Sequence, residues 1–246
     1  MKKGLLYLIL AAFGLVAKAQ TNSITKRVTL NESSIIKDEN GVIYPYLVWS
    51  RLTRTGDYSI KALKQPNTDS ISYVLVKLTN GEKEILRAQL PKPNESENFK
   101  VGDMLRPFKD KDITNEKIDT KKLLGKVIVL NFWFINCPPC RQEIPDLNEL
   151  ADSYKNNPDV LFVAIALDEA YDIKQFIKKQ PFNYHIIENG RYHADKYKLH
   201  LYPTNVVIDK AGKIAFSSVS FNMGNTHWMK KAINEALADQ TKQAAL

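Results

Sequence analysis

Two cysteines, Cys137 and Cys140, stand three residues apart in a CPPC motif, and the 246-residue chain contains no others. Residues three apart on a helix share a face, so the two sulfurs can meet in a short bridge. A permanent disulfide closing so small a loop would constrain the unfolded chain very little. A zinc site needs about four ligands, and the four histidines of the chain are scattered without ligand spacing. The motif therefore predicts reversible thiol–disulfide chemistry.

The surroundings of the motif predict which sulfur attacks. Residues 127–134 form a nearly continuous apolar run, as expected of a central buried strand, and residues 138–156 are predicted to be helical. Cys137 then falls at or beside the helix N-cap, where unpaired N–H groups and the helix dipole favour a thiolate. The thiolate is the species that attacks a disulfide. We expect Cys140, one turn into the helix, to be less exposed and to act as the resolving thiol.

The two prolines of the motif limit this stabilisation. Neither Pro138 nor Pro139 has an N–H to donate, so the amide of Cys140 is the first donor available to Cys137. Pro138 itself suits the first helical position, where a missing N–H costs nothing. A less stable thiolate predicts a more reducing couple, nearer to thioredoxin than to a strong oxidant.

The elements that would position the motif alternate between strand and helix from about residue 99 onward. Residues 160–167 are predicted to form a second buried strand. Residues 205–209 and 213–219, joined by a turn over residues 209–212, are predicted to form a hairpin. Helices are expected over residues 173–179, 191–199 and 226–238. This order predicts an α/β fold with a mixed central sheet flanked by helices.

The chain before this region has a different texture. Residues 47–63 contain two strand-like runs, and Asn80-Gly81 separates the strand-like runs 73–78 and 85–88, which predicts a hairpin. The proline-rich, polar residues 91–96 indicate a boundary. We therefore expect a small β-hairpin-rich N-terminal module over residues 20–98 and an α/β domain over residues 99–246.

The first 19 residues have the pattern of a cleaved secretory signal peptide. A basic start is followed by an apolar run and by Ala17-Lys18-Ala19, with small residues where a signal peptidase cuts. The apolar run is short for a membrane span, so we expect no stable membrane insertion after cleavage. Loss of the three leading lysines lowers the net charge from +8 to +5. The remaining charge is scattered, so a nucleic-acid partner is not expected.

The stretch GKVIVLNFWF at residues 125–134, followed by CPPCRQEIP at residues 137–145, resembles the exported thioredoxin-like TlpA/ResA family of thiol–disulfide oxidoreductases. The resemblance covers residues 100–240 and implies a thioredoxin fold. It also implies an enzyme of the periplasm or cell envelope of a bacterium that exchanges disulfides with exported partner proteins, mostly as a reductase. Apocytochrome c during cytochrome c biogenesis is one partner of such proteins, and a membrane thiol-electron carrier supplies the electrons. The resemblance implies no cofactor besides the redox-active Cys137–Cys140 disulfide.

The resemblance also implies roles for several further residues. Tyr202, Pro203 and Thr204 resemble the cis-proline loop that faces the disulfide and binds substrate. Glu143 resembles the acidic residue beside the active site, and helical spacing places it on the same face as Cys140. A carboxylate there could accept the Cys140 proton or raise the pKa of that thiol. The alternative is a solvated first-turn glutamate favoured by the helix dipole.

The chain also departs from the family pattern. Asn131 occupies the position at which thioredoxins themselves carry a buried aspartate that helps to deprotonate the resolving cysteine. Asparagine cannot take a proton, so this role is either vacant or moves to Glu143. Asn136 stands before the first cysteine, where a tryptophan is common, which removes part of the apolar docking surface. Trp133 is retained, either as a substrate-docking residue or as a core aromatic.

Two other functions use a similar scaffold. A copper or haem chaperone would bind a soft metal through the thiolates, and the copper form would want a histidine near the sulfurs, for which His227 is the candidate. A peroxiredoxin-type peroxidase needs Thr or Ser three residues before its cysteine, where this chain has Phe134. The sequence therefore favours thiol–disulfide exchange and disfavours the peroxidase.

Overall fold

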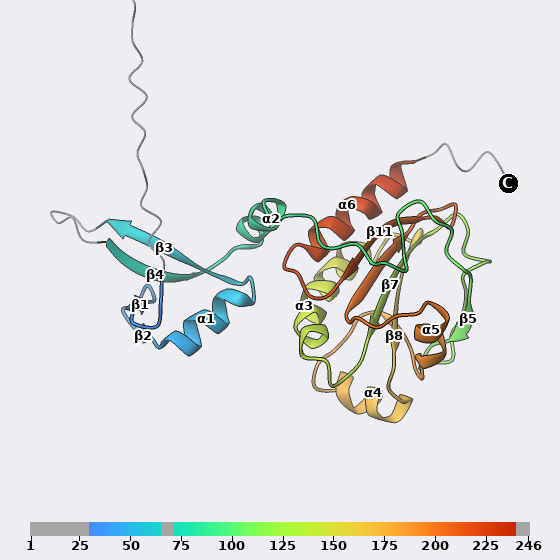
Figure 1. Ribbon diagram of the computed structural model, residues 1–246, viewed down its shortest axis with the longest axis horizontal. Coiled ribbons are helices and arrows are strands. Elements are labelled where there is room, and N and C mark those ends of the chain that lie inside the picture. The colour runs from blue at the N-terminus through green and yellow to red at the C-terminus, as the bar shows by residue number, and fades with distance from the viewer. Residues whose placement is uncertain (1–29, 65–70, 240–246) are drawn as a thin grey trace, which may run out of the picture. The chain divides into compact units, whose positions relative to one another are not determined.

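A computed structural model describes residues 30–64 and 71–239 of the chain (Figure 1). The predicted signal peptide, residues 1–19, lies outside these ranges. The chain divides into residues 1–34 and a larger unit, residues 35–246. Within the described part of the first unit, Asn31 organises a turn in which its side-chain oxygen accepts from the amide of Ser33 at 3.0 Å. The expected boundary at residue 98 stays a prediction.

The N-terminal part of the larger unit contains a four-stranded sheet with the order β2-β1-β4-β3. Its strands are β1 (Ile36–Lys37), β2 (Ile43–Tyr44), β3 (Tyr58–Lys64) and β4 (Ile71–Lys77). Strands β3 and β4 pair antiparallel along their whole length, whereas β1 pairs parallel to β4. This sheet confirms the expectation of a β-rich N-terminal region.

The first of the two strands expected within residues 47–63 is instead a helix, α1 (Tyr46–Arg54). Pro45 occupies its N-cap in an extended conformation, and Trp49 is the buried residue of the helix. Tyr46 contacts Trp49 edge to face, with ring centroids 5.1 Å apart. The strand prediction was wrong: Tyr46 and Trp49 stand three residues apart, which places them on one face of a helix, where they contact each other.

The expected Asn80-Gly81 hairpin is also wrong, because these residues begin helix α2 (Asn80–Ala88). Thr79 is the N-cap: its hydroxyl accepts from the Glu82 amide at 3.3 Å, and the Glu82 carboxylate accepts from the Thr79 amide at 2.9 Å. This reciprocal capping box satisfies two free N–H groups at the helix start. It overrides the turn preference of Asn-Gly.

The C-terminal part contains the predicted mixed sheet, with the order β11-β10-β7-β8-β9. Its strands are β7 (Val127–Trp133), β8 (Val160–Ala166), β9 (His185–Ile187), β10 (Thr204–Ile208) and β11 (Ile214–Val219). Strand β7 pairs parallel to β8 and antiparallel to β10. The hairpin predicted near residues 205–219 is confirmed as β10 and β11, which pair antiparallel.

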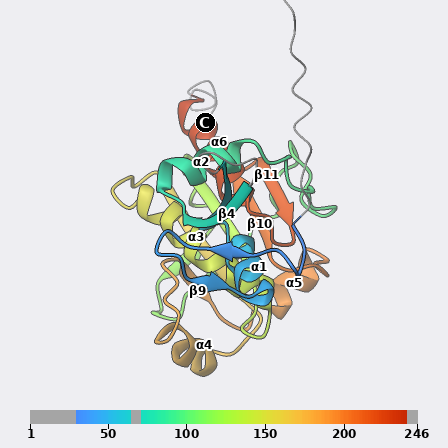
Figure 2. The same cartoon turned by 90° about the vertical axis from the view of Figure 1, so that its left-hand side faces the viewer.

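Helices cover both faces of this sheet. They are α3 (Pro138–Ser153), α4 (Ala170–Ile177), α5 (Arg191–Lys196) and α6 (Asn225–Ala238), and each overlaps a helix that the sequence predicts. Val129 and Trp133 of β7 belong to the core cluster that also contains residues of α3, α4 and α6. Leu130 and Phe132 belong to a second cluster that contains residues of α5. Alternate residues of β7 therefore bury opposite faces of the sheet. Helices α4 and α6 lie far apart in both views (Figures 1 and 2).

A short hairpin that the sequence analysis did not anticipate joins the edge of this sheet. It consists of β5 (Lys109–Lys111) and β6 (Lys117–Asp119), which pair antiparallel. Next to it, the Ile113 amide donates to the Ile186 carbonyl of β9 at 2.8 Å, and the Asp112 carboxylate lies 2.9 Å from Nδ1 of His185. Strands this short carry too few residues to show an alternating pattern. Among the described residues, no helix is long and apolar enough to cross a membrane.

Candidate active site

The two cysteines are joined by a disulfide at the junction of β7 and α3. Cys137 is the N-cap of α3 and Pro138 begins the helix. The Cys140 amide points at Sγ of Cys137 from 3.2 Å. This confirms the expectation that the amide of Cys140 is the nearby donor and that the prolines supply none.

Both sulfur-bearing residues are buried to a similar degree in the disulfide form. Cys137 is 3% exposed and Cys140 2%. The expected contrast in exposure between an attacking and a resolving thiol is therefore absent in this state. Asn136 directly before the motif and Pro138 within it are exposed, so the backbone around the buried sulfurs reaches the surface.

The loop before the motif is shaped by Asp168, which the sequence analysis missed. Its carboxylate accepts from the amide of Ile135 at 2.8 Å. Asp168 lies just beyond the end of β8, so neighbouring parallel strands deliver the aspartate and the cysteines to the same edge of the sheet. A polar residue following a buried strand was the available signal.

The peptide bond between Tyr202 and Pro203 is cis. The antiparallel register pairs Thr204 with Phe132, so Pro203 lies beside the end of β7, from which the chain continues to Cys137. Tyr202 packs edge to face on Phe134, with ring centroids 5.5 Å apart. Thr204 is fully buried and its hydroxyl donates to the carbonyl of Leu201 at 2.7 Å. Tyr202 and Pro203 thus border the site, whereas Thr204 fixes the loop from inside.

Trp133 lies in the core. It is 1% exposed and packs against Phe176 and Phe182 at centroid distances of 5.4 and 5.5 Å. Its position agrees with the core-aromatic interpretation, because a side chain this deep cannot touch a docked partner directly.

Glu143 is buried one turn beyond Cys140, with 1% of its surface exposed. Both carboxylate oxygens accept from Nδ2 of Asn205 at 3.0 Å, and Oε1 also accepts from Nδ2 of Asn225 at 2.6 Å. Nδ2 of Asn131 in turn donates to Oδ1 of Asn205 at 2.8 Å. The solvated-glutamate interpretation is therefore wrong, since the sheet and the start of α6 enclose this carboxyl.

Burial sets the protonation of this group. Desolvation raises the pKa of Glu143 to about 7, and the two asparagine donors oppose the rise because they stabilise the charged form. A carboxyl that titrates near neutrality can both accept and return a proton. Asn131 takes no proton itself, but it orients Asn205, which holds Glu143.

Asn205 and Asn225, the two donors to Glu143, were not predicted as site residues. Of the asparagines in this network, only Asn131 was singled out from the sequence. Asn205 follows the cis-proline loop at the second residue of β10, and Asn225 begins α6. A buried amide inside the apolar strand TNVVI is the one signal that could have pointed to Asn205.

The described residues give no support to a metal at the sulfurs. The group of His, Cys, Asp and Glu side chains close enough to share an ion consists of Asp112, Glu116 and His185 and contains neither cysteine. Nδ1 of His227, the histidine considered for a copper site, lies 3.5 Å from Glu84.

Comparisons with known proteins agree with this geometry. Residues 101–217 match the AhpC/TSA family. The chain is 34% identical over 122 residues to the thiol-disulfide oxidoreductase ResA of Bacillus cereus, covering 49% of this chain and 70% of that protein. It is 28% identical over 115 residues to the thioredoxin-like protein YneN of Bacillus subtilis, covering 46% and 68% of the two chains.

A solved structure from Chlorobium tepidum, described as a thiol:disulfide interchange protein DsbE, covers 57% of this chain and 99% of its own length. Its TM-score is 0.52 and its sequence identity 26%. The family match, residues 101–217, spans the CPPC turn and the cis-proline loop of this chain and strands β7 to β10 of its sheet. The chain belongs to the ResA family of thiol-disulfide oxidoreductases and is an enzyme of that class.

Proposed function

We propose that the Cys137–Cys140 pair is the redox centre of an exported reductase that transfers two electrons to disulfides of partner proteins. The observation that carries the proposal is the placement of this disulfide at the start of α3, with the Cys140 amide as donor to Cys137 at 3.2 Å. Expected partners are periplasmic proteins, with apocytochrome c as one candidate. The predicted signal peptide supports export.

The reaction begins with the reduced enzyme. The Cys137 thiolate attacks one sulfur of the partner disulfide, which breaks that bond and releases the second partner sulfur as a thiolate. Cys140 then loses its proton and attacks Sγ of Cys137. The mixed disulfide breaks, the enzyme disulfide forms, and the partner leaves as a dithiol. A membrane thiol carrier would return two electrons to the enzyme.

Glu143 supplies the proton transfer in the second half of this cycle. Its position one turn beyond Cys140 and its pKa of about 7 suit a base for the Cys140 thiol. The proton that it accepts can then pass to the departing partner thiolate. Asn205 and Asn225 hold the carboxylate in place for both steps.

The scarcity of donors around Cys137 favours the reducing direction. The prolines at the first two helical positions contribute no N–H, so the thiolate of the reduced state is stabilised less than at an ordinary helix start. A destabilised reduced thiolate makes the dithiol a better electron donor.

A trapping experiment tests this proposal. Reduced Cys140→Ser protein is mixed with a peptide that carries a Cys-x-x-Cys-His disulfide. We expect it to accumulate a mixed disulfide on Cys137, detected by mass spectrometry, because the resolving thiol is missing.

Cys137→Ser protein serves as the matched control and should form no comparable adduct. The wild-type protein should release the peptide as a dithiol. Adducts of equal yield on Cys140 would contradict the assigned roles. A couple near −120 mV, rather than about −270 mV, would contradict the reducing direction.

A further inference from the structure

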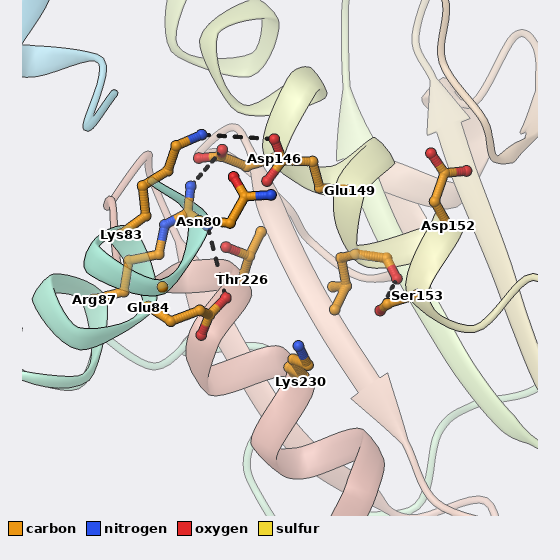
Figure 3. Close-up of a pocket in the computed structure, with 12 residues that line it drawn as sticks. Asn80, Lys83, Glu84, Arg87, Asp146, Glu149, Asp152, Ser153, Thr226 and Lys230 are labelled. Carbon is orange, nitrogen blue, oxygen red and sulfur yellow. Dashed lines mark hydrogen bonds and ion pairs between the residues drawn. The ribbon is translucent and has the colours of Figure 1, made fainter. Parts of the chain in front are cut away.

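Helix α2, which belongs to the region before the family match, packs its charged residues against α3 and α6 (Figure 3). A cavity of about 540 Å³ lies among these helices. Arg87 extends from α2 to Asp146 of α3, and Thr226 and Lys230 of α6 line the other side. Charged groups from two distant stretches of the sequence therefore meet beside the active-site helix.

The central contact is a largely buried ion pair. The Arg87 guanidinium lies 2.5 Å from the Asp146 carboxylate, and the two side chains are only 7% and 15% exposed. Arg87 also lies 4.0 Å from Glu84, one turn earlier on its own helix. Removing one partner of such a pair leaves the other charge without compensation in a poorly solvated place. At a surface pair, water would solvate the remaining charge.

Asp146 lies three residues beyond Glu143 on α3, so the two carboxyls share a face of that helix. Burial raises the pKa of Asp146 and the adjacent Arg87 lowers it. In turn, the charge of Asp146 contributes to the raised pKa of Glu143. Arg87 is thus the group that favours the charged form of Asp146, against burial and against the negative charges of Glu149 and Asp57. Asp146 itself acts on the buried Glu143 carboxyl.

Lys83, His227 and Lys230 are other cationic or titratable basic groups near Asp146, and Lys83 and His227 lie against other carboxylates. On α2, Lys83 lies 2.7 Å from Asp57 and 3.7 Å from Glu149 of α3. On α6, His227 lies 3.5 Å from Glu84, and Lys230 lines the cavity. Among the described residues, Arg87 is therefore the cation that the structure pairs directly with Asp146.

Around Glu143 itself, the further titratable neighbour is Tyr184, which is buried beside β9 and whose pKa burial and the Glu143 charge both raise. A phenol with a raised pKa stays neutral near pH 7. The charge next to Glu143 is therefore that of Asp146.

We propose that Arg87 is a positioning residue for the exchange reaction: it holds Asp146 ionised and thereby fixes the charge beside Glu143. The inference rests on the proposed role of Glu143 in the exchange cycle. It assigns helix α2 a function in the chemistry, because this helix carries the countercharge of an active-site neighbour.

The substitutions have different consequences if this is correct. Without Arg87, ionisation of Asp146 moves to higher pH, toward the titration of Glu143. The two carboxyls then share their protons and titrate in two coupled steps. Without the Asp146 charge, Glu143 should lose its proton at lower pH and in a single step.

Carbon-13 NMR of the side-chain carboxyls of the oxidised full-length protein measures both groups, with Glu143→Gln and Asp146→Asn assigning the signals. In wild type we expect Asp146 to ionise at lower pH than Glu143. In Arg87→Met the Asp146 midpoint should rise and the Glu143 curve should broaden. In Asp146→Asn the Glu143 midpoint should fall, and adding Arg87→Met to that variant should change the Glu143 curve little.

Lys83→Met is the matched control, because it removes a buried cation of the same helix that pairs with Asp57 and Glu149. It should change both titration curves less than Arg87→Met does. Arg87→Lys should preserve the wild-type order of ionisation. If Arg87→Met does not fold, Asp146→Asn and Arg87→Lys still decide the question.

Unchanged carboxyl titrations in Arg87→Met and Asp146→Asn would overturn the inference. An equal effect of Arg87→Met with and without Asp146 would also overturn it, because Arg87 would then act directly. The titration needs no turnover, so failure of the trapping experiment leaves its outcome readable. A parallel pH profile of peptide reduction should show the same order of shifts.

Discussion

At the scale of the residue, the raised pKa of Glu143 affects both the proposed proton transfer and the stability of the fold. The carboxyl is enclosed by the sheet and by the start of α6, and its raised pKa of about 7 means that the folded state prefers its neutral form. A group whose pKa is higher in the folded than in the unfolded state stabilises the fold below its unfolded value, and this contribution is lost as pH rises. The residue is therefore held at a cost to stability near neutral pH.

This predicts a pH dependence that a glutamine would remove. Between an unfolded pKa near 4.5 and the folded value of about 7, the Glu143 contribution to the free energy of unfolding should fall by about 3 kcal/mol. Urea unfolding of oxidised wild type and Glu143→Gln at a series of pH values measures the difference. Glu235→Gln, at an exposed position of α6, is the control and should parallel wild type. A wild-type slope retained in Glu143→Gln would refute the assignment.

The sequence could predict part of this residue-level picture. The position of Cys137 at the N-cap and the single donor from Cys140 follow from the two prolines and the strand before them, because these are local effects. The burial of Glu143 could not be predicted. Its partners Asn205 and Asn225 lie 62 and 82 residues away in the chain, and helical spacing identifies a shared face without saying what covers it.

At the scale of the element, competing local signals explain the wrong predictions. The buried strand β7 was predictable because its nearly continuous apolar run is typical of a central strand that is covered on both faces. Helix α2 was missed because Asn-Gly indicates a hairpin when it is considered without its neighbours. Thr79 and Glu82, at capping-box spacing on either side, carry the stronger signal.

The capping box can be tested by changing its hydroxyl. Thr79→Ala should destabilise α2 by about 1 kcal/mol, because the Glu82 amide loses its acceptor. Hydrogen exchange of the α2 amides measures this loss. Thr79→Ser retains a capping hydroxyl and should exchange like wild type. Equal protection in the alanine and wild-type proteins would show that tertiary contacts alone hold the helix.

At the scale of the whole molecule, the sheet and helix α5 are in close contact at Gly190. A Cβ atom on this residue would overlap Cγ2 of Ile165 and would lie 2.9 Å from the carbonyl oxygen of Ala166. The Gly190 amide also donates to that carbonyl at 2.8 Å. The start of α5 therefore lies directly against strand β8, the parallel neighbour of the central strand β7, next to the edge at which the site lies.

Gly190→Ala should accordingly lower the free energy of unfolding by about 2 kcal/mol, because it inserts a methyl group into a filled space. Gly81→Ala is the comparison. A Cβ there meets nothing within 4 Å, and alanine is the better helix former. Thermal or urea unfolding should place Gly81→Ala at or above wild type and Gly190→Ala below it. The opposite ranking would mean that α5 and β8 can move apart to accommodate the added methyl group at little cost.

The spacing between Pro203 and Asn205 limits which insertions and deletions the protein can tolerate. Asn205 faces Glu143 because it stands two residues after the cis-proline, on the side of β10 that also carries Val207, whereas Val206 belongs to the opposite core cluster. Side chains alternate along a strand, so adding or deleting one residue here would invert every later side chain of β10. Natural or engineered length changes in this loop must therefore fall before Pro203, where they leave the amide that holds the carboxyl in register.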